Sequence, residues 1–401
     1  MHDVHQISRQ TNTRRSARPS HPLTDCGNAE RLIDYHGESI RYCPAKKQWF
    51  SWNGYRWAPD EGAVVQLAKK TVRGMRHERT YILSQAEEEQ DDWEAVRRQA
   101  DALAKWAVRS EGAPQISAML RMAETDPRIV VEPEDFDRDP WVLNLRNGTV
   151  ELKTARFREH RPEELYTKVA GANHCVGAGC PRWMRFLEEI FAPHPDLIPY
   201  VQRAIGYTLT GDIREECVFV LVGSGRNGKS TLVGVLHDLM NQYGGVAEMD
   251  TFLSSGATKL REDVADMRGR RYVSSQEPLI NSTFAESTLK WVSGGDRLRA
   301  RRLYEHAQEF HPTHKLWLAM NRLPKLRPDD HASWNRLRVI PFDVSFKDRP
   351  NKELKLELRS EMSGILNWAI EGCMLWQRFG LGSTSSIEQA TELWRTGKLC
   401  A

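Results

Sequence analysis

Long apolar runs are absent from this sequence, and cysteines are few. No stretch approaches the roughly 18 apolar residues of a membrane-spanning helix, and residues 1–10 lack the apolar core of a secretion signal. The seven cysteines are odd in number and widely spread, which argues against a disulfide framework. These absences exclude a membrane protein and a disulfide-rich secreted domain, and they predict a protein of a reducing cytosol.

A strong compositional or charge bias is also missing. The 401 residues carry a net charge of +3, with 40% hydrophobic and 28% charged residues, as in ordinary globular proteins. A chain of this length can form two or three domains, each with its own core. Because the net charge is nearly balanced, any contact with nucleic acid must come from a local patch.

Groups of metal ligands are scarce as well. His174, Cys175 and Cys180 form the one group worth testing as a zinc site, and no second pair of ligands at zinc-site spacing accompanies them. We therefore interpret this stretch as a plain loop.

A glycine-rich loop is the most informative motif present. It follows an apolar run at 217–222, which predicts a strand buried on both faces, and it leads into a helix that continues to Met240. Backbone N–H groups in such a loop, together with the positive end of the helix, form a phosphate site. Lys229 is expected to reach the β- and γ-phosphates of ATP, and Ser230 to bind Mg²⁺. The loop consists of Gly223, Ser224, Gly225, Arg226, Asn227, Gly228, Lys229, Ser230 and Thr231.

A second strand, predicted at 271–277, ends in a carboxylate. ATP hydrolysis needs a group that orients or deprotonates water beside the γ-phosphate, and Glu277 at a strand end is suited to that task and to binding Mg²⁺. Many such enzymes carry a first acid at the position of Gln276. In this sequence the carboxylate of Glu277 therefore has to perform both tasks. A glutamate that merely ends a strand is the alternative.

A basic hairpin is predicted downstream of that strand. A Gly-Gly-Asp turn at 294–296 precedes an alternating basic strand, and after a bend the chain returns through Phe310. Arg301, Arg302 and His306 would present positive charge and polar donors to a DNA backbone. The alternative is an exposed strand edge that charge protects from pairing.

Two further strands carry polar residues at their ends. Asn321 ends an apolar strand that begins at Lys315, and its amide can contact the γ-phosphate and the attacking water. Arg336, with Arg338 as the second choice, precedes another apolar strand and can stabilise transition-state charge on a neighbouring subunit's ATP. A polar strand terminator and a structural ion pair are the respective alternatives.

The rest of the chain divides by composition and periodicity. The predicted parts are a basic disordered tail at 1–22, a mixed α/β accessory domain at 23–175, a helical collar at 181–212, a P-loop ATPase domain at 213–346 and a helical C-terminal segment at 350–401. In the accessory domain, Asn53-Gly54 and Asn147-Gly148 predict hairpin turns. The tryptophans beside the first turn are expected to pack inside a small sheet rather than stack on bases. The collar can pack against a neighbouring subunit or within its own chain.

The order of these motifs resembles that of the superfamily three helicases of phages, prophages and plasmids. The motifs are, in chain order, the phosphate loop, the lone Glu277, the Gly-Gly-Asp element, Asn321 and the stretch 336–342. The similarity is closest to the helicase part of phage and plasmid primase-helicases, and it extends upstream over 24–31, 49–57 and 143–152.

That resemblance implies an AAA+-like ATPase that uses Mg²⁺ and ATP in a bacterial host cytosol. It implies a homo-hexameric ring that pulls one strand of DNA through its centre. By this resemblance, Lys229 is the lysine of the phosphate loop and Ser230 binds the metal. Glu277 is the catalytic acid, Asn321 is the sensor, and Arg336 is the arginine that acts on the neighbouring subunit. The hairpin residues carry over only loosely, because family members vary there.

Two departures from the family pattern shape the expectation. Many relatives have a primase domain ahead of the accessory region, so a separate primase is expected as a partner. Relatives also commonly continue beyond the region 392–395 into a small DNA-binding domain, so origin recognition by such a domain is not expected. The alternatives to a helicase are a non-motor ATP-binding and DNA-binding assembly factor, and a P-loop kinase, which would need an acceptor pocket and a lid.

Overall fold

The computed structural model describes residues 21–89, 93–254, 262–276, 282–301 and 307–398. The chain forms two compact units, which are described separately: one contains residues up to 51 and 59–133, and the other contains 52–58 and the residues from 134 onward. The sequence predicts a single accessory domain to about residue 175, whereas the compact units divide at residue 133. Nearly all of the predicted tail at 1–22 lies outside the described residues. No described helix is long and apolar enough to cross a membrane.

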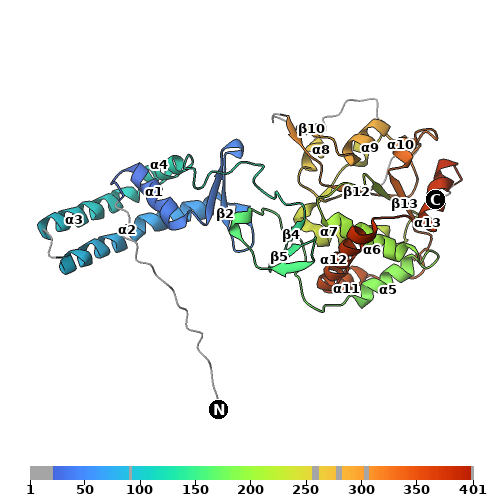
Figure 1. Ribbon diagram of the computed structural model, residues 1–401, viewed down its shortest axis with the longest axis horizontal. Coiled ribbons are helices and arrows are strands. Elements are labelled where there is room, and N and C mark those ends of the chain that lie inside the picture. The colour runs from blue at the N-terminus through green and yellow to red at the C-terminus, as the bar shows by residue number, and fades with distance from the viewer. Residues whose placement is uncertain (1–20, 90–92, 255–261, 277–281, 302–306, 399–401) are drawn as a thin grey trace, which may run out of the picture. The chain divides into compact units, whose positions relative to one another are not determined.

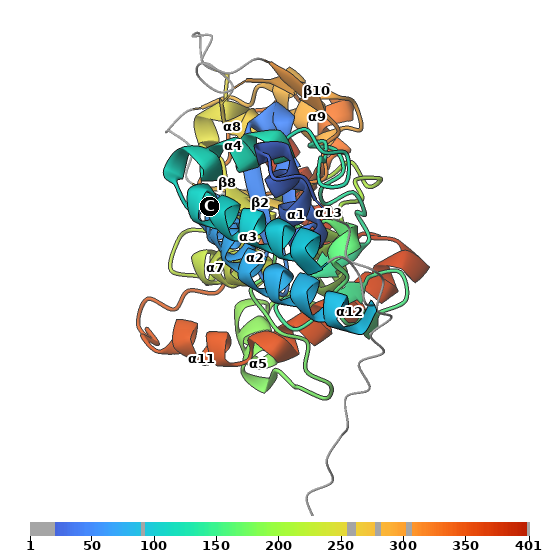
Figure 2. The ribbon, with the colours of Figure 1, turned by 90° about the vertical axis from the view of Figure 1, so that its left-hand side faces the viewer.

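The first unit is mainly helical. Its core joins the apolar faces of the helices to a short antiparallel strand pair, in which Ile40 lies opposite Ser51. Trp49 is buried in this core, which confirms for this tryptophan the predicted packing inside a small sheet, whereas Trp52 is half-buried. The two longest helices run side by side (Figures 1 and 2). The elements are α1 (Asp25–His36), β1 (Ile40–Cys43), β2 (Gln48–Trp52), α2 (Glu61–Glu89), α3 (Trp93–Ser110) and α4 (Ala113–Ala123).

Both predicted hairpin turns are found. Asn53 accepts hydrogen bonds from the backbone N–H groups of Tyr55 and Arg56, between β2 and β3 (Trp57–Pro59). The Asn147-Gly148 turn joins two strands of an antiparallel sheet, closed by a 2.9 Å bond from the Leu145 N–H to the Gly148 carbonyl. That sheet has the order β4 (Val142–Asn144), β5 (Thr149–Glu151) and β6 (Arg156–Arg158).

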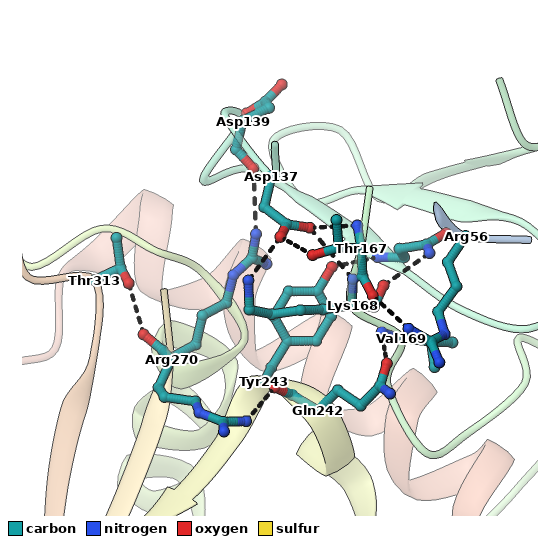
Figure 3. A network of polar contacts seen from close by, with 12 residues as sticks. Arg56, Asp137, Asp139, Thr167, Lys168, Val169, Gln242, Tyr243, Arg270 and Thr313 are labelled. Carbon is teal, nitrogen blue, oxygen red and sulfur yellow. Dashed lines mark hydrogen bonds and ion pairs between the residues drawn. The ribbon is translucent and has the colours of Figure 1, made fainter. Parts of the chain in front are cut away.

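A buried polar network ties the segment 134–170 to the large sheet of the second unit (Figure 3). Lys168 Nζ lies 2.6 Å from Asp137 Oδ2, and Arg271 donates to the carbonyl of Val142 at 2.8 Å. Burial would raise the pKa of Asp137, but the charge and hydrogen bond of Lys168 hold it below its usual value. These bonds explain why the boundary between the two compact units lies before the segment 134–170 and not after it.

The second unit is built on a five-stranded parallel sheet, in the order β13-β7-β12-β9-β8, which confirms the α/β class of the predicted fold. The strands are β7 (Val218–Val222), β8 (Gly244–Val246), β9 (Tyr272–Gln276), β12 (Lys315–Met320) and β13 (Leu337–Pro341). Val222 pairs with both Met320 and Pro341, so the three adjacent strands β13, β7 and β12 end together at one edge. The polar residues that follow the strands therefore gather at this carboxyl edge.

The two faces of the sheet are covered by different helices. Phe219, Leu221 and Trp317 join a core with α5 (Pro181–Ile190), α6 (Leu197–Leu209), α7 (Lys229–Met240), α11 (Leu354–Ser360) and α12 (Met362–Phe379). Val220 and Leu318 face the other core, with α8 (Glu262–Asp266), α9 (Glu286–Ser293), α10 (His331–Trp334) and α13 (Ser385–Arg395). Alternate residues of each strand thus point to opposite faces.

The helical collar packs within its own chain. Helix α6 lies against α12, and the two approach closely at glycines: a Cβ on Gly206 would lie 2.0 Å from the Cys373 nitrogen, and one on Gly372 would lie 2.1 Å from the Gln202 oxygen. The predicted C-terminal segment is helical in its described part, as α11, α12 and α13.

Candidate functional site

The glycine-rich loop has the geometry that its sequence predicts. It leaves β7 at Val222 and enters α7 at Lys229, and Gly225 and Gly228 adopt left-handed backbone angles, with φ of 100° and 92°. A Cβ on Gly223 would lie 2.4 Å from the Phe342 carbonyl oxygen, so only glycine fits there. The strand, loop and helix therefore place the amino end of α7 at the carboxyl edge of the sheet.

Lys229 lies at the centre of this loop and is 6% exposed. Its ammonium donates to the Gly223 carbonyl at 2.6 Å, to Asn227 Oδ1 at 3.1 Å and to Asn321 Oδ1 at 3.0 Å. Asn321 follows β12, the strand next to β7, so the loop lysine and the predicted sensor are in direct contact. Ser230 is exposed in the first turn of α7, at the end of the helix where an Mg·ATP complex would bind.

Asn227 braces the loop, a role that the sequence prediction did not assign to it. Its side chain accepts from Lys229 and donates to the Phe342 carbonyl at 3.0 Å, just beyond β13. A second bond, 2.8 Å from the Phe346 N–H to the Arg226 carbonyl, fixes the same segment to the loop. No local pattern marks Phe342 as a partner, because 115 residues separate it from Asn227.

The predicted catalytic strand is found, although its acid lies outside the described residues. β9 ends at the exposed Gln276, beside β12 and in register with it, since Ala319 pairs with Gln276. Glu277 is the next residue in the chain and is not described. Its assignment as the acid therefore stays a prediction, supported by the position at which β9 ends.

Arg336 lies at the opposite edge of the sheet. Leu337 pairs with Val218, the first residue of β7, so the length of a five-residue strand, about 16 Å, separates Arg336 from its own phosphate loop. The guanidinium forms a 2.8 Å ion pair with Glu216 and donates to the Ala332 carbonyl at 3.0 Å. Arg338 donates to the Asn335 carbonyl at 2.7 Å. Both arginines are therefore distant from the glycine-rich loop of their own chain. Their action on the ATP of another subunit stays a prediction.

The basic hairpin is present as a strand pair. β10 (Leu298–Ala300) and β11 (Gln308–Phe310) are antiparallel, with Leu298 opposite Phe310. Arg301 follows β10 and is exposed. Arg302 and His306 lie outside the described residues, so their assignment to DNA stays a prediction.

The loop around Cys175 carries no sign of a metal site. The His174 ring stacks on Phe157 with centroids 4.7 Å apart, and its backbone N–H bonds to Asn147. In the described part of the chain, no group of three or more His, Cys, Asp or Glu side chains is arranged to hold a metal ion.

Two family models and several viral proteins match parts of this chain. A family model described as D5 N terminal like matches residues 29–192, and a family of unknown function (DUF5906) matches residues 221–336. A putative helicase of Acanthamoeba polyphaga mimivirus is 29% identical over 234 residues, which cover 56% of this chain and 24% of that protein. Part of the chain thus resembles the D5 N terminal like family, and the viral proteins similar to it are named putative helicases.

Two further proteins are similar to this chain. A putative helicase of Invertebrate iridescent virus 6 is 26% identical over 249 residues, covering 59% of this chain and 25% of that protein. The chain therefore spans about a quarter of the length of these viral relatives. The apo structure of the NrS-1 C-terminal region is similar with a TM-score of 0.45 and 12% identity, over 55% of this chain and 53% of that one.

Proposed function

We propose that this chain is the motor of an ATP-dependent DNA helicase that serves replication of a phage, prophage or plasmid. It hydrolyses Mg·ATP and moves single-stranded DNA through a homo-hexameric AAA+-like ring in the host cytosol. A separate primase would supply primers. The helicase-like family supports the general activity, and the geometry of the phosphate loop supports the use of a nucleoside triphosphate.

The contact between Lys229 and Asn321 is the observation that carries this proposal. A loop that only binds phosphate needs no amide from the adjacent strand, whereas hydrolysis needs a group that detects the γ-phosphate and holds the attacking water. Asn321 Oδ1 lies 3.0 Å from the lysine ammonium, and this closeness supports its assignment to both tasks.

The chemistry follows from the partners that these side chains would exchange. Lys229 would leave Gly223 and Asn321 for the β- and γ-phosphates, and the released Asn321 amide would bind the γ-phosphate and the water. Glu277, one residue beyond β9, would take the proton from that water and help Ser230 to hold the Mg²⁺ of the substrate. Nucleotide arrival thereby changes contacts on two adjacent strands.

Subunit coupling and DNA movement would depend on the other elements. Arg336 would leave Glu216 and stabilise the transition state at the next subunit's ATP, since it cannot serve the loop of its own chain. The hairpin β10–β11, with Arg301, Arg302 and His306, would move the DNA that it holds.

A Lys229→Ala variant tests the motor. DNA-stimulated ATP hydrolysis and strand displacement on a tailed duplex should both disappear, while the exposed-lysine variant Lys153→Ala should retain wild-type rates. Full DNA-stimulated hydrolysis in the Lys229 variant would contradict the mechanism. A wild-type chain that binds ATP and the duplex but never separates the strands would instead identify a non-motor assembly factor.

A further inference from the structure

Helix α2 of the first unit has one face that the core does not use. Val64, Ala68, Val72 and Met75 are at most 1% exposed and anchor the helix in the core. On the other side, between residues 66 and 84, every residue of one helical face is exposed. Its members are Gln66, Lys69, Lys70, Arg73, Arg76, His77, Thr80, Tyr81 and Ser84. Five of them, Lys69, Lys70, Arg73, Arg76 and His77, form what we call the α2 basic face.

The charge of this face is largely uncompensated by the described residues. Arg76 lies 3.6 Å from Glu111, but the two side chains are 75% and 48% exposed, so water and salt screen the pair. The acid nearest in sequence, Glu78, is turned into the core, where it binds Arg31 at 3.0 Å. No ion pair of Lys69, Lys70 or Arg73 is found among the described carboxylates.

The composition of the α2 basic face favours a polyanion over a protein or a lipid surface. Protein interfaces place apolar and aromatic side chains at their centre and exclude charge from it, and a membrane-binding helix needs an apolar face to insert. Here the centre is basic, its flanks are the hydrogen-bonding Gln66, Thr80 and Ser84, and the single aromatic residue, Tyr81, is only 36% exposed at one end.

The spacing of the cations suits a nucleic-acid backbone. Lys69 and Arg76 are seven residues apart, which is about 10 Å along a helix axis, and one strand of DNA carries a phosphate about every 3.4 Å. We infer that the α2 basic face is a second DNA-binding surface, separate from the hairpin of the ATPase domain, and that it holds about three consecutive phosphates without reading sequence. This inference rests on the proposed function only in taking DNA as the polyanion.

Helix α3 provides a matched control. It also carries four exposed cations, Arg97, Arg98, Lys105 and Arg109. Unlike those of α2, they are interspersed with acids: Glu94 and Asp101 lie on the same helix, and Arg109 lies over the Trp106 ring at 5.5 Å. Removing four positive charges from α3 changes the net charge of the protein as much as removing four from α2. Only the change on α2 removes a continuous basic face.

The test compares two quadruple glutamine variants of the full chain, one at Lys69, Lys70, Arg73 and Arg76 and the other at Arg97, Arg98, Lys105 and Arg109. Affinity for a 30-nucleotide single strand and for a 30-base-pair duplex is measured without nucleotide between 50 and 200 mM salt, a range over which about three phosphate contacts to duplex DNA change affinity by roughly 40-fold. The α2 variant should lower the slope of log affinity against log salt by about 2 on single strands and about 3 on the duplex. The α3 variant should lower it by less than about 1.

Equal changes in the two variants, or no change in the α2 variant, would overturn the inference. So would a loss of binding to vesicles of anionic lipid with DNA affinity unchanged. Circular dichroism of both variants confirms that α2 and α3 remain helical, since glutamine is a good helix former. Because binding is measured without ATP, a chain that shows this contrast but never unwinds DNA would contradict the proposed motor and leave the α2 surface intact.

Discussion

The ammonium of Lys229 lies 3.0 Å from the amide oxygen of Asn321, although 92 residues separate the two in sequence. They meet because β7 and β12 are adjacent and parallel, with Val222 opposite Met320, so the residues that follow the strands share one edge. A bound γ-phosphate would compete for both side chains at once. The contact thus links the predicted phosphate ligand to the predicted sensor through a single hydrogen bond.

Asn321→Ala should separate nucleotide binding from hydrolysis. Loss of one aligned donor at the transition state typically lowers kcat by roughly 100-fold, whereas Lys229 keeps its bonds to the Gly223 carbonyl and Asn227 and remains placed for phosphate. Steady-state hydrolysis and equilibrium binding of ATP measure the two effects. An ATP affinity that falls as far as kcat would show that Asn321 only holds the lysine. Asn173→Ala, at an exposed position, is the control.

The Arg336→Ala variant should not hydrolyse ATP when it is assayed by itself. Mixing it with the Lys229→Ala variant should restore hydrolysis. An Arg336→Ala subunit keeps an intact phosphate loop and a Lys229→Ala subunit keeps its arginine, so a mixed ring contains competent interfaces. ATPase activity should therefore appear on mixing two inactive proteins. Glu216→Ala, which removes the ion pair of Arg336 but not the arginine, should cost at most about 1 kcal/mol of stability and keep activity. Mixtures as inactive as their components would remove the trans role.

Gly206→Ala should destabilise the second unit. The added Cβ would lie 2.0 Å from the backbone nitrogen of Cys373, so α6 and α12 would have to separate, at a cost of about 3 kcal/mol. Gly234→Ala is the matched control, because nothing lies within 4 Å of its added Cβ in α7, and alanine there should stabilise the helix by up to about 1 kcal/mol. Thermal unfolding of the full chain measures both, and equal midpoints would contradict the close helix contact.

Asp330→Asn should weaken the protein at neutral pH and not in acid. Burial would raise the pKa of Asp330, but bonds from Lys290 at 2.7 Å and from Ser333 lower it to about 2 from its usual 3.8. A lowered folded-state pKa stabilises above about pH 4, and that stability disappears as the pH falls towards 2. Asparagine still caps α10. The melting temperature should therefore be lower than wild type by about 2 °C at pH 7, with the difference closing near pH 2; a constant difference would exclude the ion pair as its cause.

Much of the second unit could be predicted from local sequence. The apolar run at 218–222, the glycines at 225 and 228 and the helix to Met240 have strong local signals, since buried strands, left-handed turns and amphipathic helices each restrict residue type. The strands that end before Asn321 and begin after Arg336 are where the sequence predicts them.

The contacts that bind these pieces together were not predictable in the same way. Nothing near Asn227 indicates that its amide bonds to the carbonyl of Phe342, because that bond depends on β13 lying beside β7. The division at residue 133 was likewise hidden, since it depends on buried bonds such as that of Arg271 to the Val142 carbonyl. Such long-range pairs are selected by packing and burial, not by neighbours in the chain.

The sequence by itself determined that a glycine-rich loop, a strand-end asparagine and a strand-leading arginine exist, because each rests on the chemistry of a short stretch. Only the tertiary structure decided that Lys229 touches Asn321 and that Arg336 lies at the far edge of the same sheet. It also left the cations of α2 together on an open face. The physical reason is that the burial of apolar faces against one another sets the strand order and the helix orientation. Strand order in turn decides whether polar residues that are distant in sequence meet at one edge of the sheet or lie a full strand length apart.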